Sequence, residues 1–198
     1  RGFAHEFGAG AGQCAFVGLG PALEQHFGDQ QVDDAIAQEF QALEGSWRGL
    51  KYLVDNTETS TSLKIKVLNT TKKELVKDFK SASDFDQSTL FKKLYEEEYG
   101  TFGGAPFATL IGDFEFGRHP EDMYLVEEIS HVCAAAHAPF LSAAAPELLG
   151  FDDFTELSGP RDLAKIFDTV EYAKWKSFRA SEDSRYVGLA MPHVLGRL

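Results

Sequence analysis

Acidic, histidine and cysteine side chains occur in this sequence at spacings that could hold a metal ion. Glu128 and His131 lie at i and i+3, and Cys133 and His137 lie at i and i+4, so each pair would share one face of a helix. Di-iron bundles use the Glu-x-x-His pair twice with two further carboxylates, and a closed zinc site needs four ligands. The sequence offers one such pair. We therefore expect no metal, and interpret Glu128 and His131 as solvated and Cys133 as a small buried apolar residue.

Two carboxylates lie near the end of a predicted strand, where α/β proteins bind ligands. Asp113 and Glu115 belong to the second half of the segment 107–116, and His119 follows shortly after it. Open α/β sheets bind ligands outside the carboxyl ends of their strands, so these side chains could perform acid–base chemistry. A solvated strand end or an ion pair at an interface explains the same residues, and we favour that interpretation.

Glycines near the amino terminus only partly match phosphate-binding loops. Gly8, Gly10 and Gly12 are followed by Gly18 and Gly20, but the dinucleotide fingerprint needs a further glycine three residues after its second one. The P-loop triplet Gly-Lys-Ser/Thr and the nucleophile elbow Gly-x-Ser-x-Gly do not occur. We therefore expect no catalytic residue, no cofactor and no enzymatic activity. An α/β ligand-binding or enzymatic domain that uses the strand-end carboxylates is the alternative.

Composition excludes several classes of partner. The 198 residues contain 19 Lys+Arg against 31 Asp+Glu, a formal net charge of −12, which argues against nucleic acid and anionic membranes as partners. With 43% hydrophobic residues, including 17 Phe, the chain can bury a core. We find no apolar run of the roughly 18–20 residues that a membrane-spanning helix needs, and two cysteines are compatible with a reducing compartment. Because the chain begins with Arg1, we expect it to be part of a longer protein.

The spacing of apolar residues predicts an α/β fold with a mixed, mainly parallel sheet covered by helices and preceded by an amphipathic helix. We divide the chain into an irregular, glycine-rich segment 1–38, an amphipathic helix and connector 39–62, and an α/β domain 63–198. A short helix is expected at 21–27. Strands are expected at 63–68, 107–116, 139–145 and 186–191, and helices at 72–80, 87–99, 120–137 and 160–170, with Leu163 and Val170 facing inward.

Aromatic residues are the most abundant candidates for contacts with other proteins. A core position explains most of them, but the amphipathic helix is hard to bury within 198 residues. Its apolar residues recur with spacings of 3, 4, 3 and 4, as one helix face requires: Phe40, Leu43, Trp47, Leu50 and Val54. The aromatic set comprises Phe40, Trp47, Tyr52, Phe102, Phe114, Phe116, Phe151, Phe154, Tyr172, Trp175 and Phe178. As interface residues we single out Trp47, Arg48, Leu50, Phe114, Phe116, Trp175 and Phe178.

Five segments resemble, in the same order, the large sheath subunit of the bacterial type VI secretion system, the TssC/VipB family. Several long segments in one order make a more specific resemblance than any short motif, and together they cover residues 40–198. The segments are LEGSWRGLKYLV (43–54), EYGTFGGAPF (98–107), IGDFEF (111–116), AAAHAPF (134–140) and WKSFRASEDSRYVGLAMP (175–192), which continues into HVLGR (193–197).

The resemblance implies a structural protein of the bacterial cytoplasm. In that family the large subunit pairs with a small sheath subunit, and further copies of the pair stack helically around an inner tube protein that contraction of the sheath ejects. A disassembly ATPase of the AAA+ class acts on the full-length protein. Residues 1–38 do not resemble the family's charged, helical amino-terminal region, and the family continues into a carboxyl-terminal half of comparable size. A phage-tail or pyocin sheath is the weaker alternative.

Overall fold

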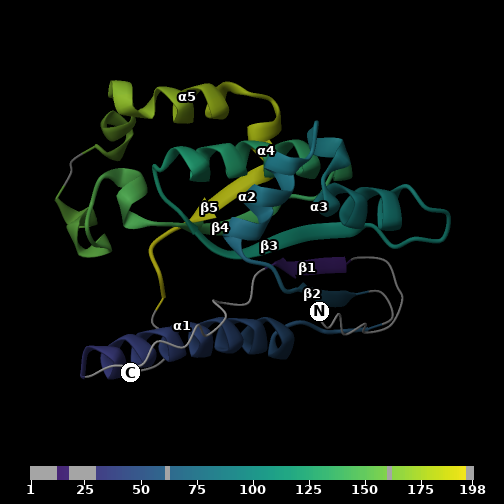
Figure 1. Ribbon diagram of the computed structural model, residues 1–198, viewed down its shortest axis with the longest axis horizontal. Helices are drawn as coiled ribbons and strands as arrows, with labels where there is room; N and C mark the ends of the chain where they lie inside the picture. The colour runs from purple at the N-terminus through teal and green to yellow at the C-terminus, as the bar shows by residue number, and fades with distance from the viewer. Residues whose placement is uncertain (1–12, 18–29, 61–62, 160–161, 195–198) are drawn as a thin grey trace.

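A five-stranded parallel sheet organises the chain (Figure 1). The computed structural model describes residues 13–17, 30–60, 63–159 and 162–194, with side chains from Phe40 onward. The strands are β1 (Gln13–Val17), β2 (Lys64–Leu68), β3 (Phe107–Phe116), β4 (Phe140–Ala144) and β5 (Val187–Ala190). They lie in the order β2-β1-β3-β4-β5, and every described pairing is parallel. The predicted α/β fold class is thereby confirmed.

Helical segments make the crossovers that parallel strands require. The longer ones are α1 (Gln30–Asp55), α2 (Lys72–Ser81), α3 (Thr89–Phe91) with its π-helical continuation η2 (Lys92–Tyr99), α4 (Pro120–Ala136) and α5 (Ala173–Ala180). The 3-10 segments are η1 (Phe85–Gln87), η3 (Pro146–Leu149), η4 (Phe154–Ser158), η5 (Leu163–Asp168), η6 (Val170–Tyr172) and η7 (Asp183–Tyr186). No helix among the described residues has the length and apolar composition needed to cross a membrane.

Local sequence signals explain where the two best-packed helices begin and end. Thr71 caps α2 in a reciprocal arrangement, since its hydroxyl accepts from the Glu74 N–H while the Glu74 carboxylate accepts from the Thr71 N–H. At the start of α4, His119 caps the helix and Pro120 occupies the first turn. The helix ends at His137, which adopts a left-handed conformation with φ 53°.

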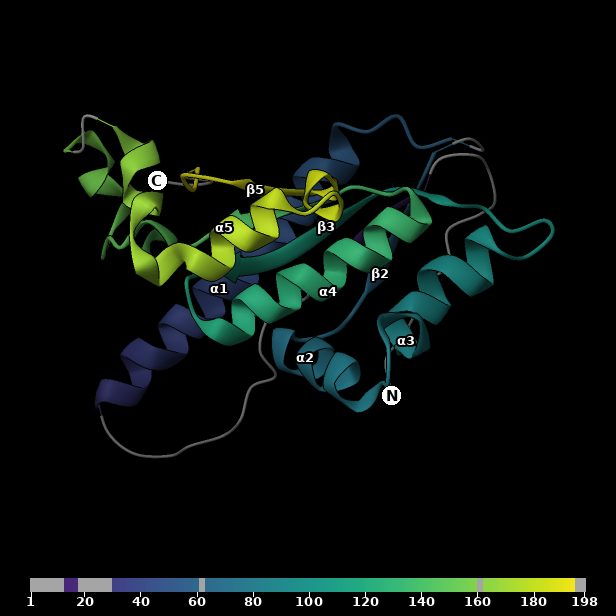
Figure 2. The ribbon, with the colours of Figure 1, turned by 90° about the horizontal axis from the view of Figure 1, so that it is seen from above.

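The strand order places α1 on the side of the sheet opposite the other described helices. The connection from β1 to β2 runs in one direction across the sheet and the later connections run in the other, so right-handed crossovers place α1 opposite the remaining helices. Figures 1 and 2 show α2, α3, α4 and α5 on one side, here called the covered side, and α1 on the other, here called the α1 side. The core lies on the covered side, and its most deeply buried side chains include Leu110, Phe116, Leu125, Val126, Val132 and Phe140.

Side chains of the sheet that point to the α1 side remain partly in solvent. Alternation along the strands directs Phe140, Ser142 and Ala144 of β4 into the core and Leu141 outward, where it is 49% exposed. Leu141 lies over Gly188 of the neighbouring β5, because a Cβ at that glycine would come within 2.9 Å of the Leu141 Cδ2. The two sides of the sheet therefore differ in how fully this chain covers them.

Two regions of the structure differ from what the sequence predicted, and the first is the amino-terminal part. Segment 1–38 was expected to be irregular, but β1 lies within it and pairs with both β2 and β3. Helix α1 begins at Gln30, ahead of the expected boundary at 39. The helix expected at 21–27 lies outside the described residues, and the division of the chain into three segments stays a prediction.

The second correction concerns residues 160–170, which were expected to form one α-helix. The described part forms the 3-10 segments η5 and η6 instead. Leu163 and Val170, expected to face inward, are exposed, whereas Ile166 and Phe167 pack against the core. A 3-10 helix has three residues per turn, so residues placed on one face by an α-helical period do not stay on one face here.

Candidate functional site

Helix α1 carries apolar side chains that the rest of the described chain does not bury. Trp47 is 53% exposed, and Phe40 and Val54 on the same face are exposed as well. Leu50 is buried, so this helix contacts the body of the domain along only part of its surface. A half-exposed tryptophan flanked by other apolar residues is typical of a surface that binds another protein.

Charged pairs and glycines shape the rest of α1. Arg48 Nε lies 2.7 Å from Glu44 Oε1, and both residues belong to adjacent turns of the helix. Gly45 and Gly49 lie on the face opposite Trp47, and a Cβ built at either one would meet no described atom within 4 Å. Each glycine costs the helix about 1 kcal/mol relative to alanine. No described residue fills the space beside these two glycines.

The remaining interface candidates lie in or beside the core. Phe116 is fully buried and its ring centroid is 6.2 Å from that of Phe140. Trp175 and Phe178 are buried with ring centroids 5.7 Å apart, and Phe114 is half-buried against Phe116. In this chain these aromatic residues stabilise the domain, unlike Trp47 and Arg48, which reach solvent.

The strand-end carboxylates do not converge with His119. Alternation along β3 directs Asp113 and Glu115 to the α1 side, where Glu115 Oε1 lies 3.4 Å from the His193 Nε2. The His119 Nδ1 instead accepts a hydrogen bond from the Glu121 N–H, at 3.3 Å, as the cap of α4. The three side chains therefore do not form the acid–base group that the alternative hypothesis requires.

A lysine spans the place where the strand order reverses. Lys72 Nζ, at the start of α2, donates to the Glu115 carbonyl oxygen at 2.7 Å and lies 2.6 Å from Asp122 Oδ1. Its ammonium group also lies 5.0 Å from the Phe116 ring centroid. Because β1 lies between β2 and β3, these contacts cross the carboxyl end of β1. Open α/β sheets usually bind ligands at this position, where the strand order reverses.

The pairs considered as metal ligands also have other roles. Burial raises the pKa of Glu128, and the His131 Nδ1 lies 2.7 Å from Asp183 Oδ2. Burial likewise raises the pKa of the Cys133 thiol, while His137 is exposed at the end of α4. Within the part of the chain that the structure describes, no group of three or more His, Cys, Asp or Glu side chains is placed to hold a metal.

Two further features lie beyond the two ends of β3, an exposed loop whose Phe102 belongs to the aromatic set and a pocket that the sequence did not indicate. At its amino end, a loop of residues 100–106 carries a fully exposed Phe102. At its carboxyl end, a pocket of about 290 Å³ opens between the start of α4 and the start of α5. Leu148, Tyr172 and Trp175 line that pocket and are themselves buried. No local motif marks a pocket formed by segments that are distant in sequence.

Comparisons with known proteins agree with the resemblance noted in the sequence. The family described as VipB (EvpB/VC_A0108, tail sheath N-terminal domain) matches residues 25–198, which include residues 25–38 that were expected not to resemble it. The type VI secretion system sheath protein TssC1 of Pseudomonas aeruginosa is 57% identical to this chain over 162 residues, which cover 81% of this chain and 32% of that protein. This chain thus spans about a third of the length of the curated relative.

Proposed function

We propose that this chain, which belongs to the VipB family of tail sheath proteins, forms part of a structural subunit of a contractile type VI secretion sheath. The observation that carries the proposal is the exposed apolar face of α1 around Trp47. A subunit of a continuous lattice must present such surfaces, because each copy contacts several neighbours. The family resemblance read from the five segments is confirmed.

The proposed partners are a small sheath subunit, further copies of the same protein and an inner tube protein. Contacts between copies that do not close into a ring produce an open helical filament. A filament of this kind can form a tubule around an inner tube. For ejection of the tube, the sheath needs two packings, of which the contracted one has the lower free energy. We further propose assembly in the bacterial cytoplasm and disassembly of the full-length protein by an AAA+ ATPase.

A structural role, rather than a catalytic one, is supported by the ends of the strands. Lys72 and Asp122 pair across the position where sheets of this strand order bind ligands. Asp113 and His119 point to different parts of the molecule. For the interface itself, the proposal retains Trp47 and Arg48 as direct contacts, with the buried aromatic residues holding the surface in place.

Co-expression tests this function. The full-length protein that carries this sequence is produced together with its small sheath subunit, and particles are viewed by negative-stain electron microscopy. We expect tubules for the native sequence and few or none for Trp47→Ala. Leu163→Ala is the matched control, since it removes an exposed apolar side chain that lies far along the chain from α1. Absence of tubules with the native sequence contradicts the proposal. Equal tubule yields from Trp47→Ala and Leu163→Ala would show that the exposed face of α1 is not an assembly contact.

A further inference from the structure

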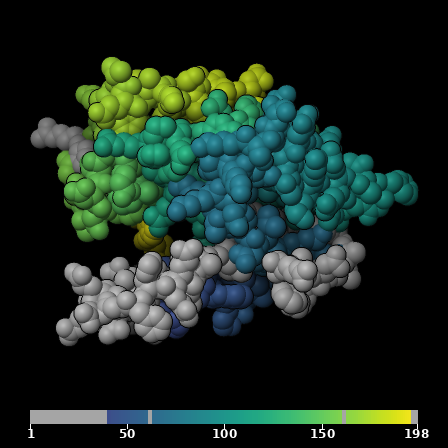
Figure 3. All heavy atoms as spheres, in the orientation of Figure 1, coloured from purple at the N-terminus to yellow at the C-terminus, as the bar shows by residue number. Residues whose placement is uncertain are grey.

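The loop between η2 and β3, residues 100–106, projects as an ordered finger. The Gly104 N–H donates to the Thr101 carbonyl oxygen at 2.9 Å, and the Ala105 N–H donates to Glu98 Oε2 at 3.1 Å. Gly103 adopts φ 83°, a conformation that favours glycine. Figures 1 and 3 show this teal segment extending from one end of the molecule. Phe102 is therefore held in solvent by a loop with its own hydrogen bonds.

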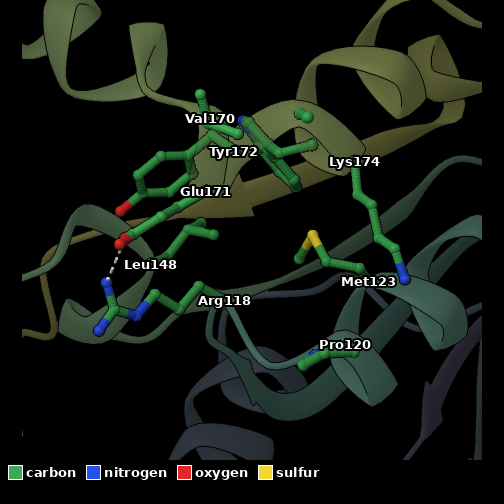
Figure 4. A pocket seen from close by; sticks show the side chains of 10 residues that line it. Arg118, Pro120, Met123, Leu148, Val170, Glu171, Tyr172 and Lys174 are labelled. Atoms are coloured by element: carbon green, nitrogen blue, oxygen red, sulfur yellow. Dashed lines mark hydrogen bonds and ion pairs between the residues drawn. The ribbon is translucent and has the colours of Figure 1, made fainter.

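A pocket at the other end of β3 has the size and lining that an aromatic ring requires. Its volume is about 290 Å³, whereas a cavity of roughly 150 Å³ is enough to bind benzene. Met123, Leu148 and Trp175 contribute apolar atoms, and Val170, which is 91% exposed, lies at its edge. Figure 4 shows Met123, Leu148 and Val170 around the hollow.

Lysine at the edge of the pocket and glutamate before the finger carry charges of opposite sign, although each place also holds a charge of the other sign. Arg118 and Lys174 lie among the lining residues, and Lys174 has no ion-pair partner among the described residues. The Arg118 Nη1 lies 3.1 Å from Glu171 Oε2, so one carboxylate is already present there (Figure 4). Glu96 and Glu97 are exposed on η2, directly before the finger. A finger that enters the pocket would bring these carboxylates near Lys174.

Phe102 cannot reach the pocket of its own chain. The finger precedes β3 and Arg118 follows it, and ten residues of strand at about 3.3 Å each separate the two by roughly 33 Å. A Phe102 ring in this pocket must therefore come from another copy. A contact that joins one end of a copy to the opposite end of the next is heterologous, and repeated it forms an open filament.

We propose that Phe102 of one copy inserts into the pocket of the next copy between α4 and α5. This inference rests on the proposed sheath function, since it names one of the contacts by which copies repeat along a lattice. The apolar walls would bury the ring, and Lys174 would attract the exposed carboxylates of η2. Glu171 opposes that attraction, so the apolar contact supplies most of the affinity.

Cysteine cross-linking tests the contact. Full-length protein bearing Phe102→Cys is mixed with protein bearing Val170→Cys, treated with a short bismaleimide and examined by denaturing gel electrophoresis. We expect a heterodimer at least tenfold above the level from Lys92→Cys mixed with Val170→Cys, because Lys92 is exposed on η2 but outside the finger. The native cysteines are present in every sample, so the native protein gives the background. Protein that carries both Phe102→Cys and Val170→Cys should form a ladder of multimers.

The outcomes separate this inference from the proposed function. A heterodimer no stronger than the Lys92→Cys control overturns the contact, and so does cross-linking of Phe102→Cys to the small sheath subunit instead. Tubules from Phe102→Ala at the native yield also overturn it, while leaving the sheath function in place. A cross-linked ladder without tubules supports the head-to-tail contact and contradicts the sheath function.

Discussion

Trp175 and Trp47 belong to opposite sides of the same sheet and have opposite surroundings. Trp175, on α5, is 8% exposed, and its ring centroid lies 6.2 Å from that of Phe167. Trp47, on α1, is 53% exposed. Both are tryptophans in amphipathic helical segments, so the residue type does not separate them. The two tryptophans differ in how many of the described helices cover their side of the sheet.

The difference indicates a division of roles between the two sides. Helices α2, α4 and α5 bury the covered side, so its side chains contribute most of the free energy of folding. On the α1 side, one helix leaves Leu141 and its own apolar face partly in solvent. A surface of that kind stabilises an assembly more than it stabilises the isolated chain.

The strongest test of this comparison is Trp175→Ala. Removal of a buried tryptophan leaves a cavity, and we expect the free energy of unfolding to fall by about 3–5 kcal/mol. Urea denaturation followed by circular dichroism measures the change. A loss below about 1 kcal/mol would show that the aromatic cluster with Phe167 and Phe178 does not support the domain.

A smaller loss is expected from Asp122→Ala at the carboxyl end of β3. The Asp122 carboxylate pairs with Lys72 and accepts from the Gly117 N–H at 2.8 Å. Both contacts are partly shielded from water, so we expect a loss of about 2–3 kcal/mol in the same denaturation experiment. Glu121→Ala is the control, since the neighbouring Glu121 pairs with Lys80 on the surface. A similar loss for both variants would remove any special role from the Lys72–Asp122 pair.

Patterns within one element predicted much of this fold. The strand β3 was placed at its observed limits because the first half of 107–116 is apolar on both faces and follows a turn that ends at Pro106. Helix α4 was placed from its proline and acidic first turn. Strand β1 was missed because Cys14–Val17 is a short apolar run among glycines with no alternation, which also describes a central strand. A central strand is identified by its two neighbours, and a single segment does not contain them.

The candidate site was less predictable because it depends on exposure. The 3, 4, 3, 4 spacing in α1 indicated an apolar face but not whether other elements cover it. Phe116 and Trp175 were also named as interface residues, and both proved to be buried. The pocket beside Arg118 joins α4 to α5 across some fifty residues of sequence. Such sites follow from topology, which local periodicity does not specify.

Trp47→Ala is expected to have a small effect on the stability of the folded chain. About half of the side chain already lies in water, so we expect the free energy of unfolding to change by less than about 1 kcal/mol. The melting temperature of the variant, measured beside that of Trp175→Ala, checks this. A loss as large as that of Trp175→Ala would mean that α1 belongs to the core, and the contrast between the two sides would fail.

The smallest expected effect is a gain in stability from Glu128→Gln on the covered side. Burial raises the pKa of Glu128 above its ordinary value of 4.5, and the nearby Glu127 and Asp84 carboxylates add to the rise against the effect of His131. Between pH 4.5 and the raised pKa, Glu128 keeps its proton in the folded state and loses it in the unfolded state. The stability of the native protein therefore falls as pH rises through this window. Because Glu128 is only half-buried, water screens the effect, and we expect a gain below about 0.5 kcal/mol at pH 7 that disappears near pH 4.

Glu98→Gln is the matched control because its sign is opposite. Burial acts to raise the pKa of Glu98, but hydrogen bonds from the Lys66 ammonium group and the Ala105 N–H outweigh it and lower the pKa below the ordinary 4.5. Ionised Glu98 therefore stabilises the folded state at neutral pH, and that contribution is lost as pH falls through the lowered pKa. Thermal denaturation of both variants at pH 4 and pH 7 should show a gain for Glu128→Gln and a loss for Glu98→Gln at the higher pH. If both variants lose stability at pH 7, partial burial of Glu128 carries no cost, and the folded state tolerates a charge at Glu128 as readily as one at Glu98.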